Sequence, residues 1–326
     1  MHNDFFLTQW VFLGMRWLYE SVTAQNIALT VIISTILIKA ITVIGDIKSR
    51  KSSAKMQTIQ PQMDKLRKKY ENDPQRLQRE SSKLMKENNV SMLGGCLPML
   101  FTMPLFFVFI AAFRQWGNEM MVHVITTLHT DPEAGVELFR NFQFLWIHNI
   151  WQPDNGFQPV IASAQTLFQG TELHRLYYFT EHPEALELFK QLGFFVESTA
   201  KNAFNGVVVA DLSQELIDKY NAIVQPCVDL YAGYNNGWFV MPILCGGTTL
   251  LSTWLMQRGQ PQAANAAGSN KMMMYLMPAM TFVFSLSTNA AFALYWTVSN
   301  VISMITTFFI NKSIGTPGAV VEVKKS

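Results

Sequence analysis

Charged residues are scarce in this chain. Only 15% of its 326 residues are Asp, Glu, Lys or Arg, against roughly 25% in an ordinary soluble domain. An apolar content of 49% excludes a disordered chain. Three cysteines are too few for a disulfide scaffold, and a net charge of +2 argues against a nucleic-acid-binding protein.

The motifs of common catalytic sites are also missing. The sequence contains no Walker-type GxxxxGK[ST], HExxH, GxSxG or paired CxxC motif, which argues against ATP hydrolysis and the common protease chemistries. Its six histidines lack the spacing of a metal site. We therefore expect a protein without enzymatic activity, metal or cofactor.

Five long apolar stretches account for the scarcity of charge. A hydrocarbon core of about 30 Å requires about 20 apolar residues in a helix, and five segments fit this length with Lys39 as their one charged residue. Buried helices of a soluble protein usually keep a polar edge, so this alternative fits poorly. We predict an all-α, polytopic membrane protein. Its predicted spans are residues 26–45, 93–113, 237–257, 272–288 and 290–310.

The segments between the spans differ in charge. Residues 46–92 carry twelve basic and six acidic residues, whereas residues 116–236 carry five basic and fourteen acidic residues. Because short basic loops stay in the cytoplasm, we expect 46–92, the loop 258–271 and the tail 311–326 to be cytoplasmic. The acidic segment 114–236 and the amino terminus are then expected outside.

Two of these regions have a predicted helical structure. Residues 1–25 place aromatic and leucine side chains at helical spacing, which indicates an amphipathic helix in the outer membrane interface. In residues 46–92, apolar positions at helical spacing predict two antiparallel helices, separated at Glu71-Asn72-Asp73-Pro74. Pro61 is expected to open or kink the first of them.

The basic loop suggests a binding role, and the acidic segment suggests a separate small domain. The loop either rests on anionic lipid or docks incoming polypeptide or the ribosome. The segment from 116 to 236 is too long for a simple connection, so we expect a small, acidic and mainly helical extracytoplasmic domain. The candidate docking residues on the basic loop are Lys65, Arg67, Lys68 and Lys69.

Lys39 is the candidate functional residue of the first span. A cation at membrane depth costs at least about 2.5 kcal/mol, so its amine should face water or a partner rather than lipid. Thr35, one helical turn earlier, shares its face. The lysine could instead snorkel toward the inner interface. Because the predicted spans contain no acidic residue to pair with it, we favour a cavity open to the cytoplasm.

Polar side chains on two other spans could line the same cavity. Residues at positions i, i+4 and i+7 share one face of a helix. Such residues also act as hydrogen-bonding contacts between helices in membranes, which is the alternative interpretation. The candidates are Trp296, Asn300 and Ser303 in the last span, and Thr248, Thr249 and Ser252 in the third.

Several of these segments resemble the YidC/Oxa/Alb membrane protein insertases. The first span, followed by Gln60-Pro61 and the run Lys-Leu-Arg-Lys-Lys-Tyr, is similar to the family's first core span and cytoplasmic hairpin. Residues 93–104 resemble its second span, and 144–154 resemble the outer segment that follows. Residues 277–300 are similar to its fourth and fifth spans.

The resemblance implies a five-helix bundle with a hydrophilic groove open to the cytoplasm. The family's groove arginine and groove threonine fall on Lys39 and Thr35, and its substrate-contacting aromatic position falls on Trp296. It implies an insertase and chaperone that acts without ATP on nascent membrane proteins in the bacterial cytoplasmic membrane. The implied protein is a monomer, with the ribosome and optionally the Sec translocon as partners.

This chain departs from the family pattern in two respects. Lysine replaces the groove arginine, and residues 157–236 form an additional extracytoplasmic insertion. A small-solute or ion transporter that uses Lys39 as an anion site is the alternative function.

Overall fold

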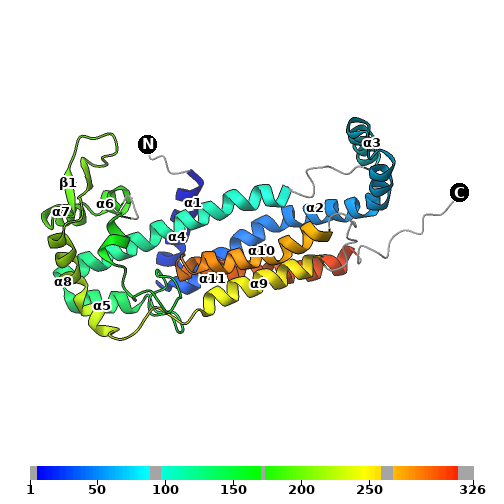
Figure 1. Ribbon diagram of the computed structural model, residues 1–326. Helices are drawn as coiled ribbons and strands as arrows, with labels where there is room; N and C mark the ends of the chain where they lie inside the picture. Colours follow the sequence, from blue (N-terminus) through cyan, green and yellow to red (C-terminus); the bar gives the residue numbers. More distant parts are fainter. Residues whose placement is uncertain (1–5, 89–96, 170–172, 258–266, 315–326) are drawn as a thin grey trace. The chain divides into compact units, whose positions relative to one another are not determined.

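The computed structural model describes residues 6–88, 97–169, 173–257 and 267–314, and these are mostly α-helical (Figure 1). The prediction of a mainly helical protein is therefore confirmed. The helices are α1 (Phe6–Ser21), α2 (Ile27–Lys69), α3 (Pro74–Glu87), α4 (Leu97–Thr130), α5 (Pro132–Arg140), α6 (Tyr178–Glu181), α7 (Pro183–Gln191), α8 (Gln214–Leu230), α9 (Val240–Gln257), α10 (Ala267–Ser285) and α11 (Ala290–Ile314).

The chain divides into two compact units. Unit 1 comprises Met1–Val31, Val108–Ile243 and Val283–Leu294. Unit 2 comprises Ile32–Phe107, Leu244–Phe282 and Tyr295–Ser326. The predicted acidic segment thus belongs to unit 1, and the basic loop belongs to unit 2.

Four of the described helices contain apolar segments that coincide with predicted spans. By length and composition, Ile27–Gly45 and Ala290–Phe309 are able to cross a membrane, and Val240–Met256 and Met274–Ser285 are shorter apolar helices. The beginning of the second predicted span, residues 93–96, lies outside the described residues. The number of spans stays a prediction.

The first predicted span and the first helix of the basic loop form one continuous helix. α2 runs for 43 residues from Ile27 to Lys69, with Pro61 inside it. Of the two expectations for Pro61, the opening of a separate helix is therefore wrong, and a kink at Pro61 stays a prediction. A proline inside a helix costs a hydrogen bond, but the flanking backbone continues the helix here.

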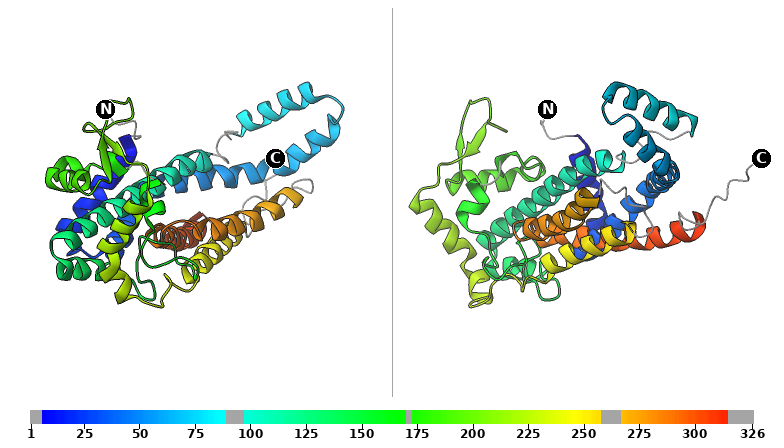
Figure 2. Two further views of the ribbon diagram at one scale, coloured as in Figure 1. Left: turned by 60° about the vertical axis from the view of Figure 1, so that its left-hand side comes forward. Right: turned by 45° about the vertical axis from the view of Figure 1, so that its right-hand side comes forward.

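A short turn joins α2 to α3, and the two helices fold back on each other (Figure 2). Asp73 begins α3, since its side chain accepts a hydrogen bond from Arg76 N and Pro74 fills the first helical turn. Ile59 on α2 and Met85 on α3 are buried together, with Met63 and Leu84 packed around them. The two-helix hairpin thus has a small apolar core beneath its charged surface.

α1 has one buried face and one exposed face. Phe12, Met15, Leu18 and Tyr19 are buried in unit 1. The other face exposes the large side chains Phe6, Trp10, Leu13 and Trp17. An exposed aromatic face suits the expected interfacial position, which stays a prediction.

Unit 1 contains an aromatic core and a small β-hairpin. α4 continues to Thr130, well beyond the end of the predicted second span. Strands β1 (Phe195–Glu197) and β2 (Val207–Val209) pair antiparallel, with Phe195 opposite Val209. Inside the loop that joins the two strands, Asn205 and Gly206 both have positive φ between the bridged residues Phe204 and Val207, as two-residue turns require. The side chains of the core include Phe168, Phe179, Phe189, Phe194, Phe195 and Tyr220.

The buried carboxylate of Asp154 organises the loops of unit 1. Its Oδ1 accepts hydrogen bonds from the backbone of Trp238 (2.6 Å) and Phe239 (3.1 Å). Its Oδ2 accepts from Met241 N (2.6 Å) and from Trp146 Nε1 (3.0 Å). We call this four-donor arrangement the Asp154 clamp. Since it satisfies free N–H groups at the start of α9, it acts as that helix's cap.

Asparagine side chains extend the same network. Asn236 Oδ1 accepts from Asn149 N (2.7 Å), and Asn236 Nδ2 donates to Asn149 O (2.8 Å). Asn155 Nδ2 donates to Leu286 O at 2.8 Å, at the end of α10. Asn289 Nδ2 donates to Phe113 O at 3.3 Å. The bonds of Asn149 and Asn155 tie the loop 142–158 to the segment before α9 and to the end of α10, and the bond of Asn289 ties the start of α11 to α4.

Removing the clamp carboxylate should destabilise unit 1 strongly. In Asp154→Ala, three backbone N–H groups and one indole N–H lose their acceptor, and each unsatisfied buried donor costs about 1 to 3 kcal/mol. We expect the midpoint of thermal unfolding in lipid nanodiscs to fall by at least about 6 °C. The exposed Asp211→Ala should move it by less than about 2 °C. Equal midpoints for the two variants would contradict the role of the clamp.

Gly237 offers a second, independent test of the clamp. Its φ is +95°, and an added Cβ would lie 1.9 Å from Asp154 Oδ1. Gly233 has a similar φ of +82°, but nothing lies within 4 Å of an added Cβ. Gly233→Ala therefore reports backbone strain alone, about 1 kcal/mol. We expect Gly237→Ala to lower the unfolding midpoint at least twice as much, and similar effects at the two glycines would argue against a tight clamp.

Candidate functional site

The structure places all eight predicted groove residues in unit 2. They come from three helices, and two sets of hydrogen bonds bring six of them together. Thr35 and Lys39 lie on α2, Thr248, Thr249 and Ser252 lie on α9, and Trp296, Asn300 and Ser303 lie on α11.

The first set joins α2 to α11 through Lys39. The half-buried amine of Lys39 donates a hydrogen bond to Ser303 Oγ at 2.9 Å. A serine hydroxyl has two acceptor lone pairs and carries no charge, so it lowers the cost of the buried ammonium without neutralising it. Thr35, one turn before Lys39, is completely buried. The amine of Lys39 therefore has a polar partner on α11.

The second set joins α9 to α11 through Thr249. Its hydroxyl accepts hydrogen bonds from Trp296 Nε1 (3.0 Å) and Asn300 Nδ2 (2.9 Å) and donates to Cys245 O (2.7 Å). Both lone pairs and the proton of this hydroxyl are thus used. Asn300 Nδ2 also reaches Thr248 Oγ1 at 3.1 Å. In this arrangement, these four residues serve as hydrogen-bonding contacts between helices, the alternative considered for them.

Trp296 is held on two sides. Besides its bond to Thr249, its ring meets that of Phe106 edge to face, with centroids 5.2 Å apart. Edge-to-face aromatic pairs add about 0.5 to 1.5 kcal/mol beyond their burial. The indole therefore has a defined orientation.

Ser252 does not join the other candidates. It is buried, and its hydroxyl lies 3.9 Å from Met256 Sδ on the same helix. Polar residues not singled out from the sequence are also buried in unit 2, among them Ser34 and Thr307. Thr307 donates a hydrogen bond to the backbone of Ser303 at 2.5 Å. The spacing of four residues from Ser303 is the signal that could have identified Thr307, whereas Ser34, directly before Thr35, had no such signal.

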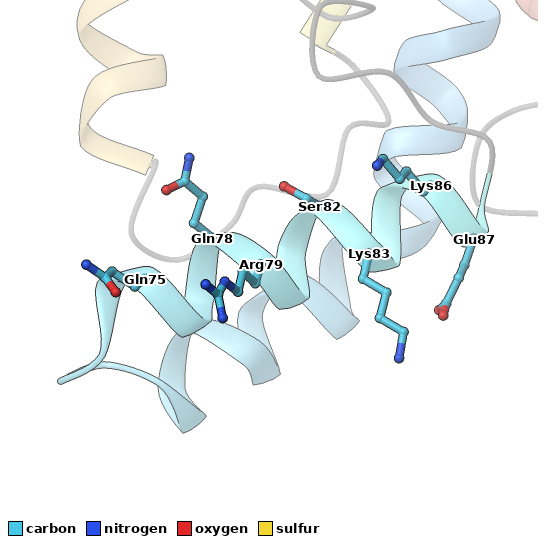
Figure 3. A pocket seen from close by; sticks show the side chains of 7 residues that line it. All are labelled: Gln75, Gln78, Arg79, Ser82, Lys83, Lys86 and Glu87. Atoms are coloured by element: carbon cyan, nitrogen blue, oxygen red, sulfur yellow. The ribbon is translucent and has the colours of Figure 1, made fainter.

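Two hollows lie on the surface of the basic hairpin. One of about 770 Å³ follows α3, where Gln75, Arg79, Lys83 and Lys86 project from the helix (Figure 3). A second of about 280 Å³ lies between α2 and α3. Its lining mixes charges of both signs, with Lys65, Lys69, Glu80, Lys83 and Glu87 among its residues.

The four predicted docking residues are all exposed on α2. Arg67 lies 3.4 Å from Asp64, and the amine of Lys69 lies 5.2 Å above the ring of Tyr70. Lys65 and Lys69 border the smaller hollow. Among the residues that the structure describes, no group of three or more His, Cys, Asp or Glu could hold a metal ion.

The chain is similar in sequence to known membrane proteins. A sequence model of the family described as 60Kd inner membrane protein matches residues 17–196 and 173–316. A relative from Clostridium perfringens, named membrane protein insertase YidC, is 27% identical over 285 residues, which are 86% of this chain and 77% of the relative.

Two further relatives with the same name share shorter regions. The one from Chlorobaculum parvum is 30% identical over 229 residues, 60% of this chain and 35% of the relative. The one from Clostridium tetani is 35% identical over 140 residues, 43% of this chain and 54% of the relative. This chain thus spans only about a third to a half of these two. Because the family match covers most of the sequence, the resemblance is confirmed, and the chain is a YidC-like member of the 60Kd inner membrane protein family.

Proposed function

We propose that this chain is a membrane protein insertase and chaperone that places nascent proteins in the cytoplasmic membrane without ATP. Its family and the names of its relatives support membrane protein insertion as the function. The observation that carries the mechanism is the Lys39 amine, held by the Ser303 hydroxyl within otherwise apolar helices. This cation would attract the acidic or polar tail of an incoming client.

Burial of apolar surface would drive the insertion step. Moving a client helix from water into lipid gains about 25 cal/mol per Å² of apolar surface, so no nucleotide is needed. The outward faces of α9 and α11 expose Leu250, Leu251 and Trp254, and Val301 and Ile305. A client helix could slide along such faces while its polar end stays near Lys39.

The topology follows from the charges of the loops. Five spans would place the amino terminus and residues 114–236 outside, and the basic hairpin and the tail inside. The exposed residues Lys65, Arg67, Lys68 and Lys69 would then meet the ribosome or a nascent chain. The chain would act as a monomer without a catalytic residue, with the Sec translocon as an optional partner.

A complementation experiment tests the function itself. Cells depleted of their own insertase would receive this chain, and membrane insertion of a small client that does not use the translocon would be followed by protease accessibility. We expect insertion to be restored. Failure in spite of normal levels of the protein in the membrane would contradict the proposal.

The charge at Lys39 should decide the recruitment of acidic tails. Two unit charges 4 Å apart interact by about 1 to 4 kcal/mol in a hydrated environment. We therefore expect Lys39→Ala to slow insertion of an acidic-tailed client about tenfold and Lys39→Glu to slow it further, while Lys39→Arg is tolerated. Lys55→Ala, an exposed lysine farther along α2, is the matched control. Full activity of Lys39→Glu would rule out the electrostatic role. If Lys39→Ala inserted the client normally but lost anion uptake into vesicles, the transporter alternative would be favoured.

Ser303 should act through Lys39. Ser303→Ala removes one hydroxyl acceptor of the amine, so we expect insertion to slow a few-fold, whereas Ser303→Thr keeps a hydroxyl and should be close to the wild type. The double variant Lys39→Ala/Ser303→Ala should be no slower than Lys39→Ala alone, because residues in contact are not additive. Additive effects in reconstituted vesicles would show that Ser303 acts independently.

A further inference from the structure

A cluster of charged side chains, of which Glu119 is the buried member, joins α1, α4 and α6 in unit 1. Arg16 on α1 contacts Glu20 of its own helix at 2.9 Å and Glu181 on α6 at 2.5 Å. Glu119 on α4 lies near enough to interact electrostatically with Arg16 and is only 4% exposed. One guanidinium thus faces three carboxyl groups from three helices, and we call this set the Arg16 junction.

Glu119 is poorly compensated as an anion. Its carboxyl group is bonded by the side chain of Gln115 and by the backbone of Tyr178. Its buried Oε1, however, has no hydrogen-bond partner among the described residues. An ionised carboxylate in such a place pays a desolvation cost that the neutral acid avoids. Burial accordingly raises the pKa of Glu119 from 4.5 to about 7.

The same surroundings couple Glu119 to the attachment of α1. Gln115, which bonds Glu119, also accepts a hydrogen bond from Gln9 of α1 at 3.4 Å. Tyr19 of α1 packs against Trp116 of α4, with ring centroids 5.5 Å apart. A charge on Glu119 would therefore arise inside the contact between α1 and α4.

We propose that Glu119 is a proton-binding site that fastens α1 to α4 and α6. With the proton bound, Arg16 is shared by the carboxylates of Glu20 and Glu181, and Glu119 is neutral. When the proton leaves, a third carboxylate is buried beside a single guanidinium, and the junction loosens. The site nevertheless keeps Arg16 bound to α6 through Glu181.

The direction of the pH dependence follows from the pKa of Glu119. Glu119 binds its proton more tightly in the closed junction than in the open one, so proton binding stabilises the closed form. This stabilisation has its full value when the pH is below the pKa of Glu119 in the open form. Here that contribution is complete below about pH 4.5 and is lost as the pH rises through about 7. From pH 6 to pH 8, the ratio of open to closed junction should rise about tenfold.

Other titratable groups around the junction act differently. His123 lies one turn after Glu119 on α4, and its ring is 6.0 Å from that of Tyr178. Burial lowers the pKa of His123 below its ordinary 6.5, so it gains charge only in more acidic solution, where it would weaken the closed form. His182 stacks on Tyr178 at 4.2 Å and contacts Glu184 at 3.1 Å. Both histidines are retained in Glu119→Gln, so this variant separates their contribution to the response from that of Glu119.

Hydrogen exchange detects such an opening even when it is rare. The full chain in lipid nanodiscs would be exchanged at pH 6 and pH 8, and the protection of α1 amides, corrected for intrinsic rates, would be compared with that of α3. We expect α1 protection to fall about tenfold at pH 8, with α3 unchanged. The measurement uses no client, so its outcome is independent of the insertase function.

Two variants separate the proton site from general effects of pH. Glu119→Gln carries a neutral amide of the same shape and should keep α1 protection constant from pH 6 to 8. Glu133→Gln, at an exposed position on α5, should respond as the wild type does. Constant protection in the wild type, which needs no substitution to test, would overturn the proposal. A tenfold loss of α1 protection at pH 8 that persists in Glu119→Gln would also overturn the proposal.

Discussion

The Asp154 carboxylate is the point on which the loops of unit 1 depend. Four N–H groups from residues 146 to 241 converge on its two oxygens, and the carboxylate is almost completely buried. A buried anion is costly unless hydrogen bonds replace its water. Three of those bonds come from Trp238, Phe239 and Met241, at and just before the start of α9, which thereby gains a cap. The same contact therefore compensates a buried carboxylate and caps the start of a helix.

Buried polar side chains have different kinds of hydrogen-bond partners in the two units. In unit 1, the Asp154 clamp and the asparagines pair side chains with backbone groups of loops, which fixes helix ends. In unit 2, the bonds run between side chains of neighbouring helices, as from Trp296 to Thr249 and from Lys39 to Ser303. A backbone partner cannot be exchanged unless the loop moves, whereas a side-chain partner can be replaced by water when one of the two side chains changes its rotamer.

Composition was sufficient to predict the helical class and the apolar segments, because lipid requires long runs without charge. It also identified Lys39, since a single cation in such a run is conspicuous. Its bond to Ser303 was not predictable, because residues 264 positions apart meet only once the helices have packed. The continuous α2 was missed because the rule for proline is local, and the surrounding helix overrode it at Pro61.

Some of the other structural features correspond to a recognisable pattern in the sequence, and others do not. The hairpin at Asn205-Gly206 had one, since this dipeptide is typical of two-residue turns. The Asp154 clamp had none, because its backbone donors lie more than eighty residues away. Glu119 also looked like one acid among fourteen in a long loop. Burial raises the pKa of Glu119, and this burial depends on the contacts of α1 and α6.

The length of α2 has a mechanical consequence. Lys39 and the exposed Lys65 belong to one uninterrupted helix, and at 1.5 Å per residue the 26 residues between them span roughly 39 Å. If the hairpin docks a partner as proposed, a rotation of the hairpin about the axis of α2 would also turn Lys39 relative to Ser303 on α11 and strain the hydrogen bond between them.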